Sequence, residues 1–484
     1  MHVANARPYR LDACQLLAAP GAEPVQCDIR IDAEDGVITR LGSAENATRD
    51  KRTELALPAL VNAHDHGRGL RGWAYGAADA PLETWRAALY AHPAIDPYLV
   101  SAVSFGRVAL SGCASIVHLH AAGDIDSLVD EALAVCRAAR DVGVRLAFVV
   151  PMRDRNSFVY DEDDDHFLQG YGTERLVMEN ALRPRYLKPA ASIETAERIA
   201  AACEGDGISV QFGPNGPQWC SDELLRRIAD ASATTGRRVH MHLLETRHQR
   251  AWADQVHPEG LIRYLDTIGL LSPRLAVAHG VWLRPDEIAL LADRGVTVVT
   301  NTSSNLRLGS GRAPISAFIK SKLAFAIGLD GFSLDDDDDA LRELRLTRLL
   351  HGHAPLAPVL DPATLFTAAC RNGFRVATGI DTGGALTVGS PADFITLDWD
   401  RLASDILPGT VDPLDVVLAR AHRGHVRRVV VAGREIARDG QLTGVDLPAL
   451  ERDLLVAARA NAGTLAQKMP LVRKQQDRLR LHFA

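Results

Sequence analysis

Two histidines stand one residue apart in the stretch LPALVNAHDHGRG, directly after an apolar run. They are His64 and His66, with Asp65 between them. Side chains two positions apart share one face of a strand, so the two imidazoles should project together at the strand end, and Asp65 to the other face. Neutral imidazoles placed in this way suit a zinc or iron ion. The spacing alone leaves open whether they are metal ligands or two polar residues at a strand end.

The same arrangement recurs at the ends of other apolar runs. RRVHMHLLE places His240 and His242 at the end of one run, with Glu245 three residues further on. LAVAHG ends in His279, and FAIGLDG ends in Asp330. A polar or charged group that closes an apolar run is costly to bury without a partner. One metal ion would satisfy these groups together, so the combined pattern predicts a metal site.

The elements that must position these residues are eight apolar runs separated by helix-period stretches such as SDELLRRIADASATTG. The runs are PALVNAH, CASIVHLH, VRLAFVV, GISVQFGP, RRVHMHLLE, RLAVAHG, VTVVTNTS and LAFAIGLDG. Continuous apolar strands that alternate with helices indicate a parallel sheet, and eight such units indicate a (β/α)8 TIM barrel. The polar residues lie at the carboxyl ends of the strands, which is the active-site rim of such a barrel.

Both ends of the chain differ from this central part in their sequence pattern. Residues 1–57 contain PVQCDIRIDAEDGVITRLG, a hairpin pattern around Asp-Gly, and residues 386–446 return to strand-like sequence with glycine turns. We expect the two segments to form one small β-sandwich domain beside a barrel that spans residues 58–385. Residues 447–484 have helical periodicity and are predicted to form a helical tail.

The bulk composition excludes several classes of partner. The chain has 484 residues and a net charge of −7, so no basic surface indicates nucleic acid. No signal peptide is recognisable at the N-terminus, and no apolar run approaches membrane-spanning length. The seven cysteines are scattered without a CxxC pair, which fits free thiols in a reducing compartment. We therefore expect a cytoplasmic protein that binds neither nucleic acid nor membranes.

The ordered motifs resemble those of the amidohydrolase superfamily, in the mononuclear branch of cytosine deaminase and atrazine chlorohydrolase. The matching stretches are NAHDH, HMHLLET, AHG, TNTSSNLRLGSGRAP and GLDG. Binuclear relatives bridge two ions with a lysine or glutamate on the fourth strand. The corresponding run here, GISVQFGPNGPQWCS, contains neither residue type, which favours a single ion.

The resemblance implies a role for each of the motif residues. One divalent ion, Zn²⁺ in the first place and Fe²⁺ as the alternative, would be held by His64, His66, His242 and Asp330. Glu245 would shuttle protons, and His279 would contact the water on the ion, while His240 would support the site without binding the metal. Homodimers are common among such relatives, so a homodimer is expected.

The expected reaction is hydrolytic deamination of a small amino-substituted nitrogen heterocycle of the aminopyrimidine, pterin, purine or triazine type. A divalent ion lowers the pKa of bound water from about 16 towards about 7, so hydroxide could attack the carbon that carries the amine. Glu245 and Asp330 would move the protons that release ammonia. Two alternatives stay open: cleavage of an amide or urea C–N bond or loss of an alkylamine or halide from a ring, and a catalytically inactive binding or assembly relative.

Several residues near the rim could contact the substrate. Relatives often carry a histidine after the fourth strand where this chain has Asn215, and Gln218 and Trp219 in the same loop could pair with and stack on a flat ring or only pack the loop. Arg68 could recognise a carbonyl or carboxylate or remain a solvated rim residue. His120 could line the pocket or be a hydrogen-bonded barrel residue.

Two further segments have an interpretation from sequence. Residues 151–172 follow the third strand and could form a lid over the site. The acidic run Asp335–Asp339 precedes ALRELRLTRLL, and it is predicted to cap a helix and to interact with its dipole.

Overall fold

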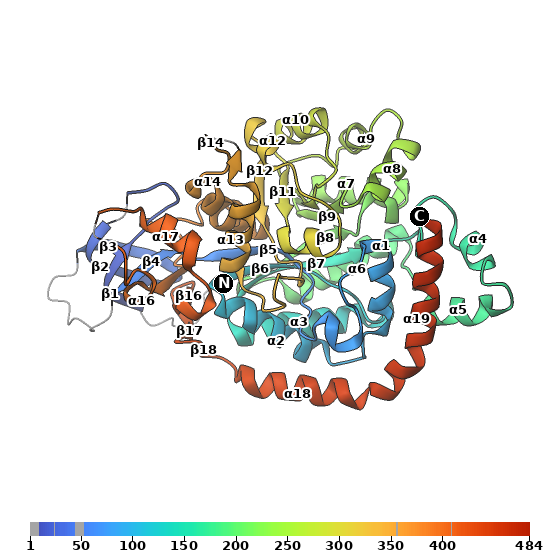
Figure 1. Ribbon diagram of the computed structural model, residues 1–484, viewed down its shortest axis with the longest axis horizontal. Coiled ribbons are helices and arrows are strands. Elements are labelled where there is room, and N and C mark those ends of the chain that lie inside the picture. Colours follow the sequence, from blue (N-terminus) through green and yellow to red (C-terminus); the bar gives the residue numbers. More distant parts are fainter. Residues whose placement is uncertain (1–8, 24, 44–52, 355–356, 408) are drawn as a thin grey trace.

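The computed structural model describes residues 9–23, 25–43, 53–354, 357–407 and 409–484. Its centre is an eight-stranded sheet in which strands β5 to β12 lie in sequence order, each paired in parallel with the next. Helices surround this sheet (Figure 1). The predicted TIM barrel is therefore confirmed.

All eight apolar runs form barrel strands. The strands are β5 (Leu60–Asp65), β6 (Cys113–Leu119), β7 (Arg145–Met152), β8 (Ile208–Pro214), β9 (Val239–Leu243), β10 (Leu275–His279), β11 (Thr297–Thr300) and β12 (Ala324–Ile327). Nearly every strand residue is buried, as expected where helices cover the outside of a parallel sheet. The continuous apolar runs are thus explained by burial on both faces.

The last strand returns to the first at the carboxyl rim. The backbone N–H of Asp330 donates to the carbonyl oxygen of His64 at 2.9 Å, and the N–H of Leu329 donates to Oδ1 of Asn62 at 2.9 Å. These bonds hold the end of β12 against β5. The loop that carries Asp330 therefore lies directly beside the strand that carries His64.

Helices cover the outer face of the barrel and close the end opposite the carboxyl rim. The covering helices are α2 (Pro97–Leu110), α3 (Leu128–Val142), α6 (Pro189–Cys203), α7 (Asp222–Thr235), α8 (Arg247–Val256), α9 (Leu261–Thr267), α10 (Pro285–Asp293), α12 (Ile315–Lys320) and α13 (Ala340–His351). Helix α15 (Gly373–Thr378) packs Phe374, Val376 and Ala377 onto the inward-facing residues of the strands. The interior is therefore filled from below, and only the carboxyl rim is available for a site.

The remaining helices are short or lie at the rim and in the small domain. They are α1 (Leu82–Ala88), α4 (Asp164–Gln169), α5 (Arg175–Leu182), α11 (Thr302–Arg307), α14 (Pro362–Thr367), α16 (Trp399–Leu402) and α17 (Pro413–Arg420). The predicted cap at the acidic run is confirmed: Asp339 accepts hydrogen bonds from the backbone N–H groups of Leu341 and Arg342 at the start of α13.

Both ends of the chain contribute to a second eight-stranded sheet, in the order β18-β17-β16-β15-β4-β1-β2-β3. Its strands are β1 (Tyr9–Leu16), β2 (Val25–Glu34), β3 (Val37–Ser43), β4 (Glu54–Pro58), β15 (Phe394–Asp398), β16 (Val426–Val431), β17 (Arg434–Arg438) and β18 (Gln441–Leu442). The predicted hairpin is present, with Asp35 and Gly36 between β2 and β3. The N–H of Ile38 donates to the carbonyl of Ser390, so the sheet folds back until β3 meets the segment before β15.

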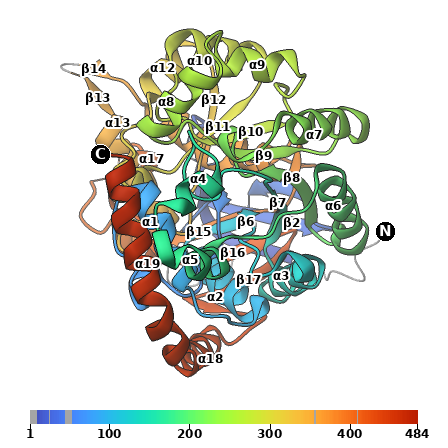
Figure 2. The same cartoon turned by 90° about the vertical axis from the view of Figure 1, so that its right-hand side faces the viewer.

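The helical tail consists of α18 (Leu447–Ala460) and α19 (Ala462–His482). It leaves the small sheet and runs along the barrel, so that α19 lies beside α1, α4 and α5 (Figures 1 and 2). Among the described residues, no helix is both long and apolar enough to cross a membrane.

Candidate metal centre

Three imidazole nitrogens and one carboxylate oxygen converge inside the rim of the barrel. Oδ1 of Asp330 lies 3.3 Å from Nε2 of His64 and 3.2 Å from Nε2 of His66. Nε2 of His66 lies 3.3 Å from Nε2 of His242. The strand ends of β5, β9 and β12 thus bring together four groups that are far apart in the sequence.

The other ring nitrogens of these histidines determine which nitrogen carries the proton. Nδ1 of His66 lies 2.9 Å from the carbonyl oxygen of Leu119, and Nδ1 of His242 lies 2.6 Å from that of Asn215. A carbonyl oxygen only accepts, so each Nδ1 is the donor, and in the neutral ring each Nε2 then presents a lone pair. Two lone pairs that face each other at 3.3 Å repel, and a cation between them removes this repulsion.

The donor set fits a divalent ion. Nε2 of His64 and Oδ1 of Asp330 are buried and have no hydrogen-bond partner. Ligand atoms about 2.0–2.1 Å from a tetrahedral zinc centre lie about 3.3–3.4 Å from one another, which matches the separations of 3.2–3.3 Å found here. The potential ligand atoms form two overlapping groups: His64, His66 and His242; and His64, His279 and Asp330.

Local backbone geometry turns the rim residues inward. His279 and Asp330 have φ angles of +74° and +60°, in a region of backbone conformation that residues other than glycine rarely adopt. Gly328 lies where an added Cβ would meet Oδ1 of Asn301 at 2.3 Å and the Cβ of His64 at 2.9 Å. A side chain at residue 328 would therefore push His64 out of the cluster.

Glu245 and His279 lie next to the cluster of potential metal ligands, which is formed by His64, His66, His242 and Asp330. Nε2 of His279 is 3.8 Å from Oε2 of Glu245, and both side chains are almost fully buried. Burial raises the pKa of Glu245 to about 7. This carboxyl group can therefore both hold and release a proton near neutral pH, as a proton shuttle must.

Three polar residues without a predicted role hold the side chains of His279, Asp330 and Glu245 in place. Oδ1 of Asn305 lies 2.8 Å from Nδ1 of His279, and the hydroxyl of Ser304 donates to Oδ2 of Asp330 at 2.5 Å. The hydroxyl of Ser310 donates to Oε1 of Glu245 at 3.3 Å. All three lie in the stretch NTSSNLRLGSG directly after β11, and a run of polar residues at the carboxyl end of an apolar strand was the signal available in the sequence.

Two residues next to the histidines of the cluster, Asp65 and His240, form hydrogen bonds that support the site. Asp65 accepts hydrogen bonds from Nδ2 of Asn62 and from the backbone N–H groups of Gly67 and Gly331, so it holds together the two loops that carry His66 and Asp330. Nε2 of His240 lies 2.8 Å from Nδ1 of His64, with the two rings stacked. His240 therefore orients His64 from below.

Two of the three candidate substrate contacts in the loop after β8, Asn215 and Trp219, touch the cluster at His242. Trp219 packs edge-on against His242, with ring centroids 6.2 Å apart. Oδ1 of Asn215, Nε2 of Gln218 and Nε1 of Trp219 are buried and have no hydrogen-bond partner. Buried polar atoms are normally paired, so these three atoms lack the partner that such atoms usually have.

The other two candidates are already engaged within the protein. Nε2 of His120 lies 2.7 Å from a carboxylate oxygen of Glu131, and Nδ1 of His120 lies 3.2 Å from His118. Arg68 donates to the carbonyl oxygen of Asp330 and lies over the ring of Trp85 at 5.0 Å. The structure therefore pairs His120, which directly follows β6, with Glu131 of α3 rather than with the cluster, and gives Arg68 a part in holding the Asp330 loop.

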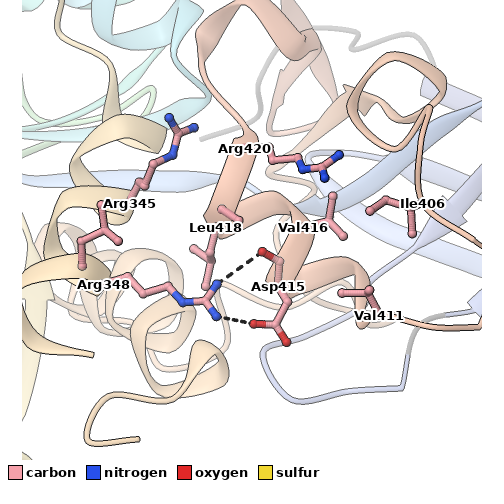
Figure 3. A pocket seen from close by; sticks show the side chains of 10 residues that line it. Arg345, Arg348, Ile406, Val411, Asp415, Val416, Leu418 and Arg420 are labelled. Carbon is pink, nitrogen blue, oxygen red and sulfur yellow. Dashed lines mark hydrogen bonds and ion pairs between the residues drawn. The ribbon is translucent and has the colours of Figure 1, made fainter. Parts of the chain in front are cut away.

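A separate cavity of about 480 Å³ lies between α13 and α17, remote from these residues in the fold (Figure 3). Its lining is mostly aliphatic, and Arg348 forms an ion pair across it with Asp415. None of the residues of the cluster of potential metal ligands lines it.

Comparison with known proteins places the chain in a family. Residues 55–436 match the amidohydrolase family, which covers well over half of the sequence. The chain belongs to this family, so the resemblance predicted from the motifs is confirmed.

The relatives of the chain include several deaminases. A 5′-deoxyadenosine deaminase of Methanothermobacter thermautotrophicus is 29% identical over 427 residues, which cover 86% of this chain and 88% of the relative. A 5-methylthioadenosine/S-adenosylhomocysteine deaminase of Pyrococcus horikoshii is 28% identical over 437 residues, covering 87% and 93% of the two chains.

Solved structures share the fold over nearly the whole length. An adenosine deaminase from Xanthomonas campestris with bound zinc superposes with a TM-score of 0.74 at 23% identity, covering 98% of each chain. An atrazine chlorohydrolase variant from Arthrobacter aurescens TC1, complexed with zinc and atraton, gives 0.75 at 19% identity, covering 92% of this chain and 100% of the other.

Proposed function

We propose that this protein is a hydrolase that uses one divalent metal ion to deaminate an amino-substituted nitrogen heterocycle. The observation that carries the proposal is the set of inward-facing Nε2 lone pairs with Asp330, beside a glutamate whose pKa is about 7. The relatives named as deaminases, which align over most of the chain, support the same reaction type.

In this proposal, His64, His66, His242 and Asp330 hold the ion. Three imidazole nitrogens and one carboxylate oxygen are ligands that zinc commonly takes, and iron is the alternative. Zinc-bound neighbours with the same fold support zinc. When bound, a divalent ion supplies a strong nucleophile from water near neutral pH.

The residues of the chain move the protons of the reaction. The bond between Asn305 and Nδ1 of His279 leaves Nε2 of His279 facing Glu245 and the cluster. His279 can therefore orient the attacking water. Asp330 accepts a proton from the attacking water, and the hydroxyl of Ser304 holds its Oδ2 so that the carboxylate keeps this orientation. Glu245, with its pKa near 7, delivers a proton to a ring nitrogen, and the proton taken up by Asp330 passes to the amine, which leaves as ammonia when the C–N bond breaks. The proton of the added hydroxyl returns to Glu245 as the carbonyl forms.

Recognition of the heterocycle falls to the loop after β8. We assign the unpartnered atoms of Asn215, Gln218 and Trp219 to the substrate, because a flat heterocycle offers both hydrogen-bonding edges and a face for stacking. Arg68 acts through the Asp330 loop that it contacts, and His120 acts as a supporting residue of the barrel.

We also propose a cytoplasmic location and a homodimer. Five cysteines among the described residues are free and buried, which supports a reducing compartment: Cys113, Cys136, Cys203, Cys220 and Cys370. Light scattering coupled to size-exclusion chromatography would give the number of chains in solution.

Ammonia release across a panel of aminopyrimidines, pterins, aminopurines and aminotriazines tests the function. The zinc-loaded protein should release ammonia and leave a carbonyl on the ring for at least one class. If alkylamine, halide or amide cleavage products appear and ammonia from the ring does not, the deaminase assignment is wrong. If zinc-replete protein transforms nothing on the panel, an inactive binding relative is favoured instead.

A further inference from the structure

The connection between β7 and α6 is much longer than the few residues that usually join a barrel strand to its helix. Residues 153–182 of this connection contain α4 and α5 and have a small apolar core of their own, which includes Phe158, Phe167, Met178 and Leu182. We refer to residues 153–182 as the lid segment. It follows the carboxyl end of a barrel strand, and it therefore lies on the active-site face.

The beginning of the lid segment is attached to the loop that carries the proposed substrate contacts. The side chain of Asp154 accepts hydrogen bonds from the N–H and the hydroxyl of Ser221, at 2.7 and 2.6 Å. Nδ2 of Asn156 donates to the carbonyl oxygen of Gln218 at 2.6 Å. Asn156 also has a φ of +54°, so the chain turns sharply directly after this attachment.

Helix α19 holds the outer part of the lid segment. Nε of Arg478 donates to the carbonyl oxygen of Phe167 at 3.0 Å, and its guanidinium lies over the ring of Phe167 at 4.7 Å. Nε2 of His482 lies 2.7 Å from Oδ1 of Asp161. Leu479 belongs to the apolar core of the lid segment. Helix α19 runs beside α4, α5 and α1 (Figure 2).

Tyr160 connects this assembly to the catalytic-type residues. Its ring lies 5.6 Å from that of Phe483 on one side and 5.8 Å from that of Trp219 on the other. Its hydroxyl donates to Oε1 of Glu83 at 3.4 Å, and the same oxygen accepts from the hydroxyl of Thr246 at 2.6 Å. Thr246 directly follows Glu245 in the chain.

Thr246 is also part of the turn that fixes the backbone of Glu245. The N–H of Gln249 donates to the hydroxyl oxygen of Thr246, and Oε1 of Gln249 accepts from the N–H of Glu245 at 2.8 Å. A contact at the tip of the lid segment is therefore only two hydrogen bonds away from the backbone turn that holds Glu245. Tyr160 and Trp219 are both nearly inaccessible to solvent, as is Glu245 itself.

We propose that the lid segment is a closing element held shut by α19, and that Tyr160 is a positioning residue which fixes the turn of Glu245 through Glu83 and Thr246. The proposal rests on the proposed function for the role of Glu245. Substrate enters only when the contacts of α19 with the lid segment open, and closure excludes water from the site.

Hydrogen–deuterium exchange of the full zinc-loaded protein tests the part played by α19. Phe483→Ala removes the ring contact with Tyr160, and Arg478→Ala removes the hydrogen bond to Phe167 and the contact with its ring. In each variant, peptides from residues 153–182 should exchange about five- to tenfold faster. Peptides from the barrel strands should be unchanged. Leu481→Ala is the matched control, because Leu481 lies on the same helix and is 82% exposed.

The lid proposal is overturned if both variants exchange like the control over residues 153–182. Arg478→Ala keeps the test available if Phe483→Ala does not fold. The exchange measurement requires no substrate, so its failure is separate from a failure of the proposed deaminase activity.

Kinetics of Tyr160→Phe test the positioning role. The variant keeps the ring between Phe483 and Trp219 but loses the hydroxyl donor, so kcat should fall about three- to tenfold with KM and zinc content unchanged. Tyr160→Ala should lower kcat further and also accelerate exchange of the lid segment. An unchanged kcat in Tyr160→Phe, or a rise in KM at constant kcat, contradicts positioning of Glu245.

Discussion

At the scale of single residues, the geometry of the site depends on the hydrogen-bond partner of Nδ1 in each histidine ring. The carbonyl oxygens of Leu119 and Asn215 and the side chain of Asn305 each lie beside an Nδ1 atom, so that Nε2 of His66, His242 and His279 faces the centre. Such partners fix both the tautomer and the orientation of a ring. The pattern HxH does not reveal them, because they come from other strands.

Asn305 offers a test of this principle away from the proposed ligands. Asn305→Ala removes the acceptor for Nδ1 of His279, which frees the ring to rotate or to change tautomer. We expect kcat to fall about 10–100-fold, with one ion per chain retained. Steady-state kinetics with metal analysis of the same preparation measures both. Loss of the ion in step with activity would contradict the assignment of His279 to water rather than to metal.

Glu245 should make the stability of the metal-free protein depend on pH. Burial raises its pKa from 4.5 to about 7, so the folded state holds this proton more strongly than the unfolded state does. Its contribution to stability is complete below pH 4.5 and is lost as the pH rises through about 7. The glutamine of Glu245→Gln cannot titrate. As the pH rises between these values, the free energy of unfolding of the wild type should therefore fall relative to that of the variant.

Denaturant unfolding of both chelator-treated proteins at pH 4.5 and pH 8 gives the comparison, with Glu223→Gln on the exposed face of α7 as the control. A gap between the wild type and Glu245→Gln that is the same at both pH values would show that Glu245 has an ordinary pKa. In the zinc-loaded state the same substitution should lower kcat about 10²–10⁴-fold, as expected for loss of a general acid.

At the scale of elements, the sequence was sufficient to locate all eight barrel strands. Runs such as CASIVHLH and VTVVTNTS are continuous rather than alternating because both faces of the parallel sheet are covered. The position of α19 could not be predicted in this way. Its periodicity shows a helix, whereas its contacts with the lid segment depend on side chains such as Arg478, which pairs with residues more than three hundred positions away.

The cap of α13 is a prediction at this scale. Asp339→Ala removes the acceptor for two N–H groups at the start of the helix and for the N–H of Arg423 in the small domain. We expect a loss of about 1 kcal/mol in the free energy of unfolding. Asp339→Asn should retain most of the cap, since asparagine is an equally good capping residue. Equal losses for the two variants, measured by thermal unfolding, would assign the effect to the charge instead.

At the scale of the whole molecule, the barrel and the small sheet are joined by a buried ion pair. Nε of Arg145, in β7, lies 2.7 Å from Asp393, which precedes β15 and also accepts from the N–H of Ala432. Both segments of the small domain were predicted from their strand-like texture and glycine turns. That they form one domain was predicted as well. The particular neighbours in the sheet, such as β4 and β15, could not be predicted, because the whole barrel sequence lies between these two strands.

Arg145→Ala should be strongly destabilising, because it leaves the carboxylate of Asp393 buried without its cation. We expect a loss of about 2–3 kcal/mol in the free energy of unfolding, somewhat less than for a fully enclosed pair since Arg145 keeps some contact with solvent. Arg185→Ala breaks an exposed ion pair with Asp124 and should have little effect in the same unfolding assay. Similar losses for both variants would refute a special role for the Arg145 pair.

The most direct test of the central claim is a titration of zinc into chelator-treated protein while ammonia release from a reactive amino-heterocycle is followed. The account predicts no release without zinc and a rate that rises linearly to one equivalent of zinc per chain and then levels off. Ammonia release by the metal-free protein, or a rate that saturates only at two equivalents, would contradict a single ion held by His64, His66, His242 and Asp330.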